Sequence, residues 1–117
     1  MSASTDAACL FCRIVRKEIP ARIAFEDDRL LAFHDVAPKA PTHVLVIPKT
    51  HVARLSDASG DHAALLGPCL VALTEIARSL SLDSYRVVIN DGAQAGQSVF
   101  HLHLHLLGGR AFAWPPG

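Results

Sequence analysis

The sequence predicts an α+β domain in which an antiparallel β-sheet packs against one long helix. Short segments rich in β-branched and aromatic residues lie both before and after a single long segment with helical spacing of apolar residues. Strands on both sides of one helix, joined by short turns, are typical of an antiparallel α+β sheet. The 117 residues, half of them apolar, are enough for one core and too few for two.

Three strands are expected before the long helix. Residues 22–26 and 30–34 flank the turn residues Asp27 and Asp28, and this arrangement predicts a β-hairpin. Residues 43–47 are rich in β-branched side chains and end at Pro48, which predicts a third strand.

Two helices are expected, a short one near the N-terminus and the long one in the middle of the chain. In residues 10–18 the apolar positions recur at helical spacing, and Pro20 closes the segment. Residues 61–80 carry one apolar stripe, in which Cys69 is a core residue, and Pro68 is expected to bend this helix. The stripe consists of Leu65, Leu66, Cys69, Leu73, Ile76, Ala77 and Leu80.

After the long helix, residues 85–90 and 99–107 are predicted as strands. Residues 91–97 form a glycine-containing loop between them, and Gly108 and Gly109 end the last strand.

Composition limits the function classes. Eleven basic and eleven acidic residues cancel, which excludes a charge-driven attraction to nucleic acid or to an anionic membrane. Residues 1–8 are predicted to be a flexible tail with no secretory signal, followed by a single domain over residues 9–117, and no segment is long enough to span a bilayer. We therefore expect a cytoplasmic protein, in which Cys9-x-x-Cys12 indicates metal or redox chemistry rather than a disulfide framework.

The last predicted strand is the informative segment. Side chains alternate along a strand, so His101, His103 and His105 are expected to share one face. The opposite face carries Phe100, Leu102, Leu104 and Leu106, which can pack against the long helix. Three histidines on one face are hard to explain as packing, because each buried imidazole needs polar partners. Two interpretations remain at this point, a metal site and a catalytic histidine array.

His-x-His-x-His followed by two apolar residues resembles the signature of the histidine-triad (HIT) superfamily. The similarity runs from about Cys9 to Gly117 and is greatest to the Hint branch, the purine nucleoside phosphoramidases. Further matching stretches occur in the same order at residues 16–21, 25–28, 32–36, 40–43 and 45–49 and at the terminal Trp114-Pro115-Pro116-Gly117.

The resemblance implies hydrolysis of the P–N bond of AMP-like or GMP-like phosphoramidates, including aminoacyl-adenylates, through a nucleotidyl-histidine intermediate. His103 would attack the phosphorus, His105 would donate to the phosphate or the leaving group, and His43 would relay protons. The residues implied to hold the phosphate are Asn90, Gly96, Gln97 and Ser98.

The resemblance also implies a nucleoside site. Asp35 would accept hydrogen bonds from the ribose hydroxyls, although by itself it is equally typical of a turn before Pro38. The implied base slot consists of Phe11, Ile19, Phe33, Val36 and Leu45; for the two phenylalanines core packing is the alternative. Trp114 would anchor the C-terminus or reach the active site of a second subunit, because the resemblance implies a homodimer with its two sheets joined.

Some members with the N-terminal cysteine pair bind structural zinc, and the matching ligands here are Cys9, Cys12, His51 and His101. Catalysis would require no metal. The alternative is that Cys9 and Cys12 are ordinary thiols at the start of a helix.

Other functions remain open alongside the phosphoramidase. They are a dinucleoside polyphosphate hydrolase and a non-catalytic interaction protein that binds nucleotide or zinc. A nucleotidyltransferase would place glutamine at the third triad position, and His105 argues against it.

Overall fold

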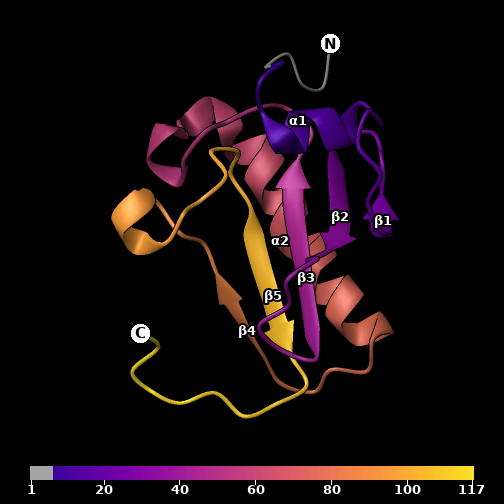
Figure 1. Ribbon diagram of the computed structural model, residues 1–117, viewed down its shortest axis with the longest axis vertical. Coiled ribbons are helices and arrows are strands. Elements are labelled where there is room, and N and C mark those ends of the chain that lie inside the picture. The colour runs from indigo at the N-terminus through magenta and orange to yellow at the C-terminus, as the bar shows by residue number, and fades with distance from the viewer. Residues whose placement is uncertain (1–6) are drawn as a thin grey trace.

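The computed structural model describes residues 7–117, and it contains a five-stranded antiparallel sheet with the long helix on one face (Figure 1). This arrangement confirms the predicted α+β class; the first six residues of the predicted tail 1–8 lie outside the described residues. The sheet has the order β1-β2-β3-β5-β4, with strands β1 Ile23–Glu26, β2 Leu30–His34, β3 Thr42–Pro48, β4 Tyr85–Val88 and β5 Leu104–Gly108. The helices are α1 Leu10–Val15 and α2 Ala63–Ser79, with 3-10 turns η1 Leu55–Asp57, η2 Gly60–His62 and η3 Ala93–Ala95.

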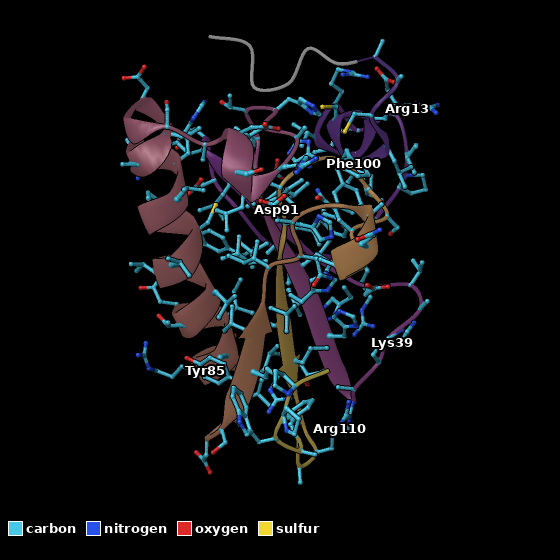
Figure 2. All side chains as sticks on the ribbon, turned by 90° about the vertical axis from the view of Figure 1, so that its left-hand side faces the viewer. Arg13, Lys39, Tyr85, Asp91, Phe100 and Arg110 are labelled. Carbon is cyan, nitrogen blue, oxygen red and sulfur yellow. The ribbon has the colours of Figure 1, made fainter. Side chains whose placement is uncertain are left out.

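The two faces of the sheet carry two separate apolar clusters, because side chains alternate along each strand. One cluster packs under α2 and contains Leu30, Ala32, Val44, Val46, Leu104 and Leu106 from the strands and Cys69, Ala72, Leu73, Ile76 and Ala77 from the helix. The other cluster joins Leu31, Phe33, Leu45 and Ile47 to α1. Figure 2 shows α2 on one side of the sheet and the loop of Lys39 on the other. Cys69 is therefore a core residue, as predicted.

Strand register places histidines on the face that α2 does not cover. In the β3–β5 ladder Leu45 lies opposite His105, and His43 lies opposite Leu107. His43 and His105 are therefore diagonal neighbours, which is within reach of two imidazole rings.

The predicted strand over residues 99–107 is wrong at its start, because β5 begins only at Leu104. The ladder with β3 ends at Val46 opposite Leu104 although β3 runs on to Pro48, and the ladder with β4 ends at Val88 opposite His105, so residues 99–103 pair with neither strand. Leu102 instead donates its amide to the Val52 carbonyl. Phe100, expected on the helix-packing face, is 41% exposed.

The ends of other helices and strands also differ from the predicted ones. α1 ends at Val15 rather than at residue 18, because Lys17 adopts a left-handed φ of 65° and reverses the chain before Pro20. β4 stops at Val88, and α2 is preceded by the 3-10 turn η2. In the α2 stripe Leu65, Leu66 and Leu80 are not buried, and Ala72 is buried in addition to the predicted residues. Within residues 7–117, no helix combines the length and apolarity needed to cross a membrane.

Candidate active site

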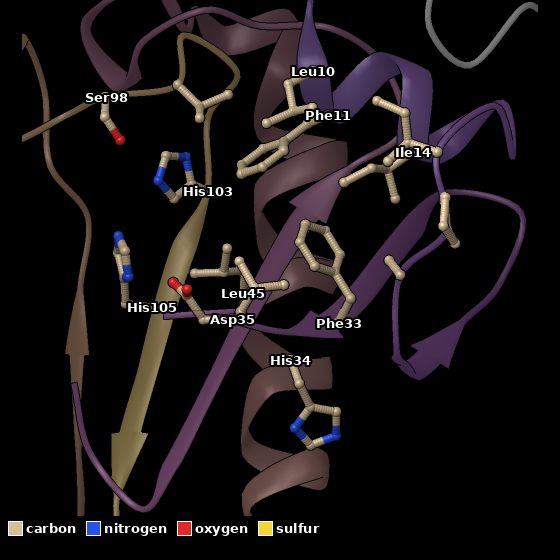
Figure 3. Close-up of a pocket in the computed structure, with 15 residues that line it drawn as sticks. Leu10, Phe11, Ile14, Phe33, His34, Asp35, Leu45, Ser98, His103 and His105 are labelled. Atoms are coloured by element: carbon tan, nitrogen blue, oxygen red, sulfur yellow. The ribbon is translucent and has the colours of Figure 1, made fainter. Parts of the chain in front are cut away.

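A cavity of about 360 Å³ opens on the sheet face away from α2, between α1 and the histidines (Figure 3). Its volume is in the range of small-molecule sites, which are mostly apolar with a few polar groups at fixed positions. The predicted residues that line it are Phe11, Ile19, Phe33, Asp35, Val36, Leu45, Ser98, His103 and His105. The apolar side chains form one end, and the two imidazoles, the Asp35 carboxylate and the Ser98 hydroxyl gather at the other.

His103 is held in one tautomer by the backbone. It is 6% exposed, and its Nδ1 lies 2.7 Å from the carbonyl oxygen of His101. A carbonyl only accepts hydrogen bonds, so Nδ1 carries the proton and donates it. The lone pair of the neutral ring is then on Nε2, which is the nitrogen left to act as a nucleophile.

His43 and His105 form a directed hydrogen-bond chain. The Lys39 amide donates to His43 Nδ1 at 3.1 Å, so the proton of neutral His43 is on Nε2. His43 Nε2 then donates to His105 Nδ1 at 2.9 Å, which puts the His105 proton on its own Nε2. That Nε2 is buried and has no hydrogen-bond partner among the described residues. The chain therefore presents a donor where a ligand atom can accept it.

Burial keeps these rings neutral. Desolvation lowers the pKa of His103, with the His101 carbonyl acting in the opposite direction. Desolvation, followed by the charges of His103 and His43, lowers the pKa of His105 to about 4. The pKa of His43 is also lowered by burial, against the pull of the Asp35 carboxylate 3.5 Å from Nε2. At neutral pH the site therefore contains an unprotonated nucleophile beside an uncharged donor.

A second cavity, of about 420 Å³, lies next to the first. Asp35, Ser98 and His105 line both cavities, and Asn90 and Lys39 line only the second. A ligand that fills the first cavity can thus extend past His105 into a more polar space.

The Gln97 side chain bonds to the backbone instead of facing a cavity, as its implied phosphate-holding role would require. Gln97 is 3% exposed; its Oε1 accepts from the Gly92 amide at 2.8 Å, and its Nε2 donates to the carbonyls of Ala53 and Val99 at 2.8 and 3.1 Å. The side-chain amide is committed to the backbone and lines neither cavity. Gly96 has a left-handed φ of 104°, which glycine adopts without strain, and it lies beside Asn90.

Trp114 lines neither cavity and is 82% exposed, so within residues 7–117 it contributes to neither of these two sites. Among the residues that sequence reasoning missed, Leu10 and Ile14 line the first cavity with Phe11. Their spacing of four residues on the predicted helix was the available signal, because such residues share a helix face. Pro20, Ala21, His34 and Val99 also line this cavity and gave no signal of their own.

Cys9, Cys12, His51 and His101 converge at the start of α1, with their ligand atoms all within 4.8 Å of one another. Cys9 Sγ lies 3.4 Å from His101 Nδ1, and Cys12 Sγ lies 3.2 Å from His51 Nδ1. His101 Nε2 donates to the Pro48 carbonyl at 2.7 Å, which leaves its Nδ1 lone pair directed at the cluster. This cluster could hold a metal ion, and all four residues were predicted.

The fold and its histidine array define a histidine-triad protein. A model of the HIT domain matches residues 16–112, and the chain belongs to this family. It is 56% identical over 109 residues to an uncharacterized HIT-like protein of Synechococcus elongatus, a match that covers 92% of this chain and 96% of that protein.

Solved structures agree with this assignment. The crystal structure of a HIT family hydrolase from Legionella pneumophila has a TM-score of 0.90 and 50% identity, covering 93% of this chain and 99% of that one. A HIT family hydrolase from Clostridium thermocellum has a TM-score of 0.91 and 41% identity, covering 93% and 96%. The chain thus has the fold of HIT family hydrolases.

Proposed function

We propose that this protein belongs to the Hint branch and hydrolyses the P–N bond of purine nucleoside 5′-phosphoramidates through a nucleotidyl intermediate on His103. The observation that carries the proposal is the hydrogen bond from His103 Nδ1 to the His101 carbonyl. It leaves Nε2 unprotonated beside the His105 donor and the Ser98 hydroxyl (Figure 3).

In the first step His103 Nε2 attacks the α-phosphorus and the P–N bond breaks. The departing nitrogen accepts a hydrogen bond from His105 Nε2–H, the buried donor that has no partner among the described residues, and takes its proton from solvent, so that the neutral amine leaves. In the second step water attacks the phosphorus, releases its proton to solvent and frees the nucleoside monophosphate from His103. Ser98 and Asn90, which line the space around His105, are assigned to the phosphate oxygens.

The apolar end of the first cavity suits a nucleoside base. Phe11 and Phe33 meet edge to face at a centroid distance of 5.3 Å and form one wall with Ile19 and Leu45. Asp35, at the boundary between the two cavities, is assigned to the ribose hydroxyls. The substrate class is therefore an AMP-like or GMP-like phosphoramidate, including aminoacyl-adenylates.

We assign the Cys9–Cys12–His51–His101 cluster to a structural zinc ion. Tetrahedral zinc with Zn–N of about 2.0–2.1 Å and Zn–S of about 2.3 Å places its ligand atoms about 3.3–3.8 Å apart. Four of the six separations in the cluster lie close to this range, from 3.2 Å between the two histidine Nδ1 atoms to 3.5 Å between Cys12 Sγ and His101 Nδ1, and all six lie within 4.8 Å. Because all four positions are supplied by protein, the ion would be structural, and the catalytic steps do not use it.

We further propose a homodimer joined along β4. This strand is an edge of the sheet and carries the exposed side chains of Tyr85 and Val87, and open edges are surfaces on which a second strand can add. Trp114 would then be available to the partner. Sedimentation should give twice the 12.5 kDa of one chain.

Purine nucleotides, rather than nucleic acid or a membrane, are the proposed partners, since the formal net charge is zero. Within residues 7–117 none of the three cysteines forms a disulfide, and we place the protein in a reducing compartment, the cytoplasm.

The test compares wild type and His103→Ala on an adenosine 5′-phosphoramidate that carries a fluorescent amine. We expect kcat/KM to fall by at least about a thousandfold in the variant, because loss of a nucleophile removes the covalent route. Mass spectrometry of acid-quenched wild type during turnover should show one nucleotidyl adduct on His103.

His62→Gln is the matched control, because His62 lies in η2 and lines neither cavity. It should retain turnover. A wild-type protein that binds AMP but does not cleave the phosphoramidate would contradict the proposal, and a His103→Ala protein with full turnover would exclude His103 as the nucleophile.

A further inference from the structure

We infer that metal at the Cys9–Cys12–His51–His101 cluster and nucleotide in the first cavity bind cooperatively, because one short segment, residues 9–21, belongs to both sites. The inference rests on the proposed function, which supplies both ligands. It goes beyond that function by making the structural metal a determinant of nucleotide affinity.

The short helix α1, with its cap residue Cys9, carries residues of both sites. Cys9 caps its start and Cys12 follows one turn later, while Leu10, Phe11 and Ile14 between and after them line the cavity. The helix has six residues, far fewer than an isolated helix needs to be stable in water. Its position therefore depends on what it contacts, namely the sheet-face apolar cluster and the two histidines of the metal cluster.

Of the other two metal ligands, His101 belongs to the segment that carries the proposed nucleophile. His51 follows β3, and His101 lies two residues before His103. The His101 side chain faces the cysteines, while its carbonyl accepts the hydrogen bond that His103 Nδ1 donates at 2.7 Å. A metal at the cluster thus joins α1 to the backbone that fixes the nucleophile.

Phe11 links the two sites directly. Its ring meets the rings of His101 and His103 edge to face, at centroid distances of 6.1 and 5.1 Å, and it is buried. Phe11 also lies between the two cysteine ligands in sequence. A nucleotide that fills the cavity packs on Phe11, and a metal held by Cys9 and Cys12 fixes the backbone on both sides of it.

Both ligands consequently favour the same docked position of residues 9–21. When metal is removed, α1 keeps its apolar contacts and the weaker Cys9–His101 and Cys12–His51 contacts but loses the metal bonds, so local opening of this segment becomes less costly. The apolar cluster that packs under α2 contains no residue of α1, so the remainder of the fold is retained. Two ligands that select one state increase each other's affinity by the same factor.

The experiment measures that factor in both directions. AMP affinity is determined by calorimetry on metal-loaded and metal-free protein, and Zn²⁺ affinity by competition with a chelator, with and without saturating AMP. We expect metal to raise AMP affinity at least about fivefold and AMP to raise Zn²⁺ affinity equally. Hydrogen exchange should quicken in residues 9–21 of the metal-free protein, slow again on adding AMP, and remain unchanged in α2.

Two variants locate the coupling. Phe11→Ala, which removes the ring between the sites, should reduce the coupling factor toward one. Cys69→Ala, a buried cysteine in α2 outside the cluster, should leave the factor unchanged.

Equal AMP affinities with and without metal, no bound Zn²⁺, or global unfolding of the metal-free protein would each overturn the inference. Because AMP binding needs no turnover, the outcomes stay separate. Cooperative binding without phosphoramidate cleavage would defeat only the proposed reaction, and cleavage with independent binding would defeat only the coupling.

Discussion

At the residue scale, the protonation states of the site follow from backbone groups with a single hydrogen-bonding role. The His101 carbonyl can only accept and the Lys39 amide can only donate, so together they fix where the protons of His103, His43 and His105 lie. The order of donors ends at His105 Nε2, on a side chain that lines both cavities. No charged side chain is needed to set this order.

Gln97 belongs to the same scale, although it acts on the loop rather than on a ligand. Gln97→Ala removes three hydrogen bonds to the backbone of Ala53, Gly92 and Val99 and leaves those groups without their side-chain partner. An unsatisfied polar group costs about 1–3 kcal/mol when it is fully buried. Ala53, Gly92 and Val99 are only partly buried, so water can replace part of the lost bonding, and we expect the unfolding free energy to fall by about 2–3 kcal/mol in total. Urea denaturation measures this change.

Gln94 provides the control, since it is an exposed glutamine in the same loop. Gln94→Ala should change the unfolding free energy by less than about 0.5 kcal/mol. If the two variants were equally stable, the bonds of Gln97 would not be supporting the loop.

At the element scale, the ends of the helices and strands determine what reaches the site. α2 ends at Ser79, and Ser81 then takes a left-handed φ of 61°, with Ser81 donating to the Arg78 carbonyl and Leu82 to the Ala77 carbonyl. Helices commonly end in this way with glycine at the left-handed position. Here a serine occupies it and carries the steric cost.

Ser81→Gly should therefore stabilise the protein. A left-handed conformation costs a residue with a Cβ about 1–2 kcal/mol, and the greater freedom of glycine in the unfolded chain offsets part of that gain. We expect a net increase in unfolding free energy of about 0.5–1 kcal/mol, measured by thermal or urea denaturation.

Ser79→Gly is the matched substitution two residues earlier, inside α2. There glycine should cost about 0.5–1 kcal/mol relative to an ordinary helix former. A gain from both substitutions, or from neither, would contradict the conformational explanation.

At the scale of the whole molecule, burying neutral histidines links stability to pH. An unfolded histidine titrates near 6.5, whereas burial lowers the pKa of folded His105 to about 4. Between pH 6.5 and about 4, His105 is protonated in the unfolded chain and neutral in the folded chain. Stability is therefore full above pH 6.5 and is lost as the pH falls toward 4.

The shift predicts that His105 alone lowers the unfolding free energy by about 3 kcal/mol between pH 7 and pH 4. Urea denaturation across this range should give a shallower decline for His105→Gln than for wild type. His62→Gln, outside the site, should decline in parallel with wild type, and a parallel decline for His105→Gln would refute the assignment.

The sequence by itself determined the fold class, the hairpin, the long helix and the segment that concentrates His101, His103 and His105. Alternation along strands and helical spacing depend only on neighbouring residues, so they can be read without the fold. The same local logic indicated metal or redox chemistry for Cys9 and Cys12, and a metal site or a catalytic array for the three histidines. It extended the last strand too far, because residues 99–103 leave the ladder and Leu102 donates to the Val52 carbonyl, a contact between distant segments that the local pattern does not encode.

Only the tertiary structure decided which atoms of these residues face one another. It separated His101, directed at the cysteines, from His103 and His105, directed at the cavity, and it assigned Gln97 to the backbone. These outcomes depend on Pro48, Lys39, Ala53 and Phe11, which lie far away in sequence from the histidine segment. Hydrogen bonds and ring contacts between distant segments exist only after the sheet has brought them together, and no spacing rule along the chain encodes them.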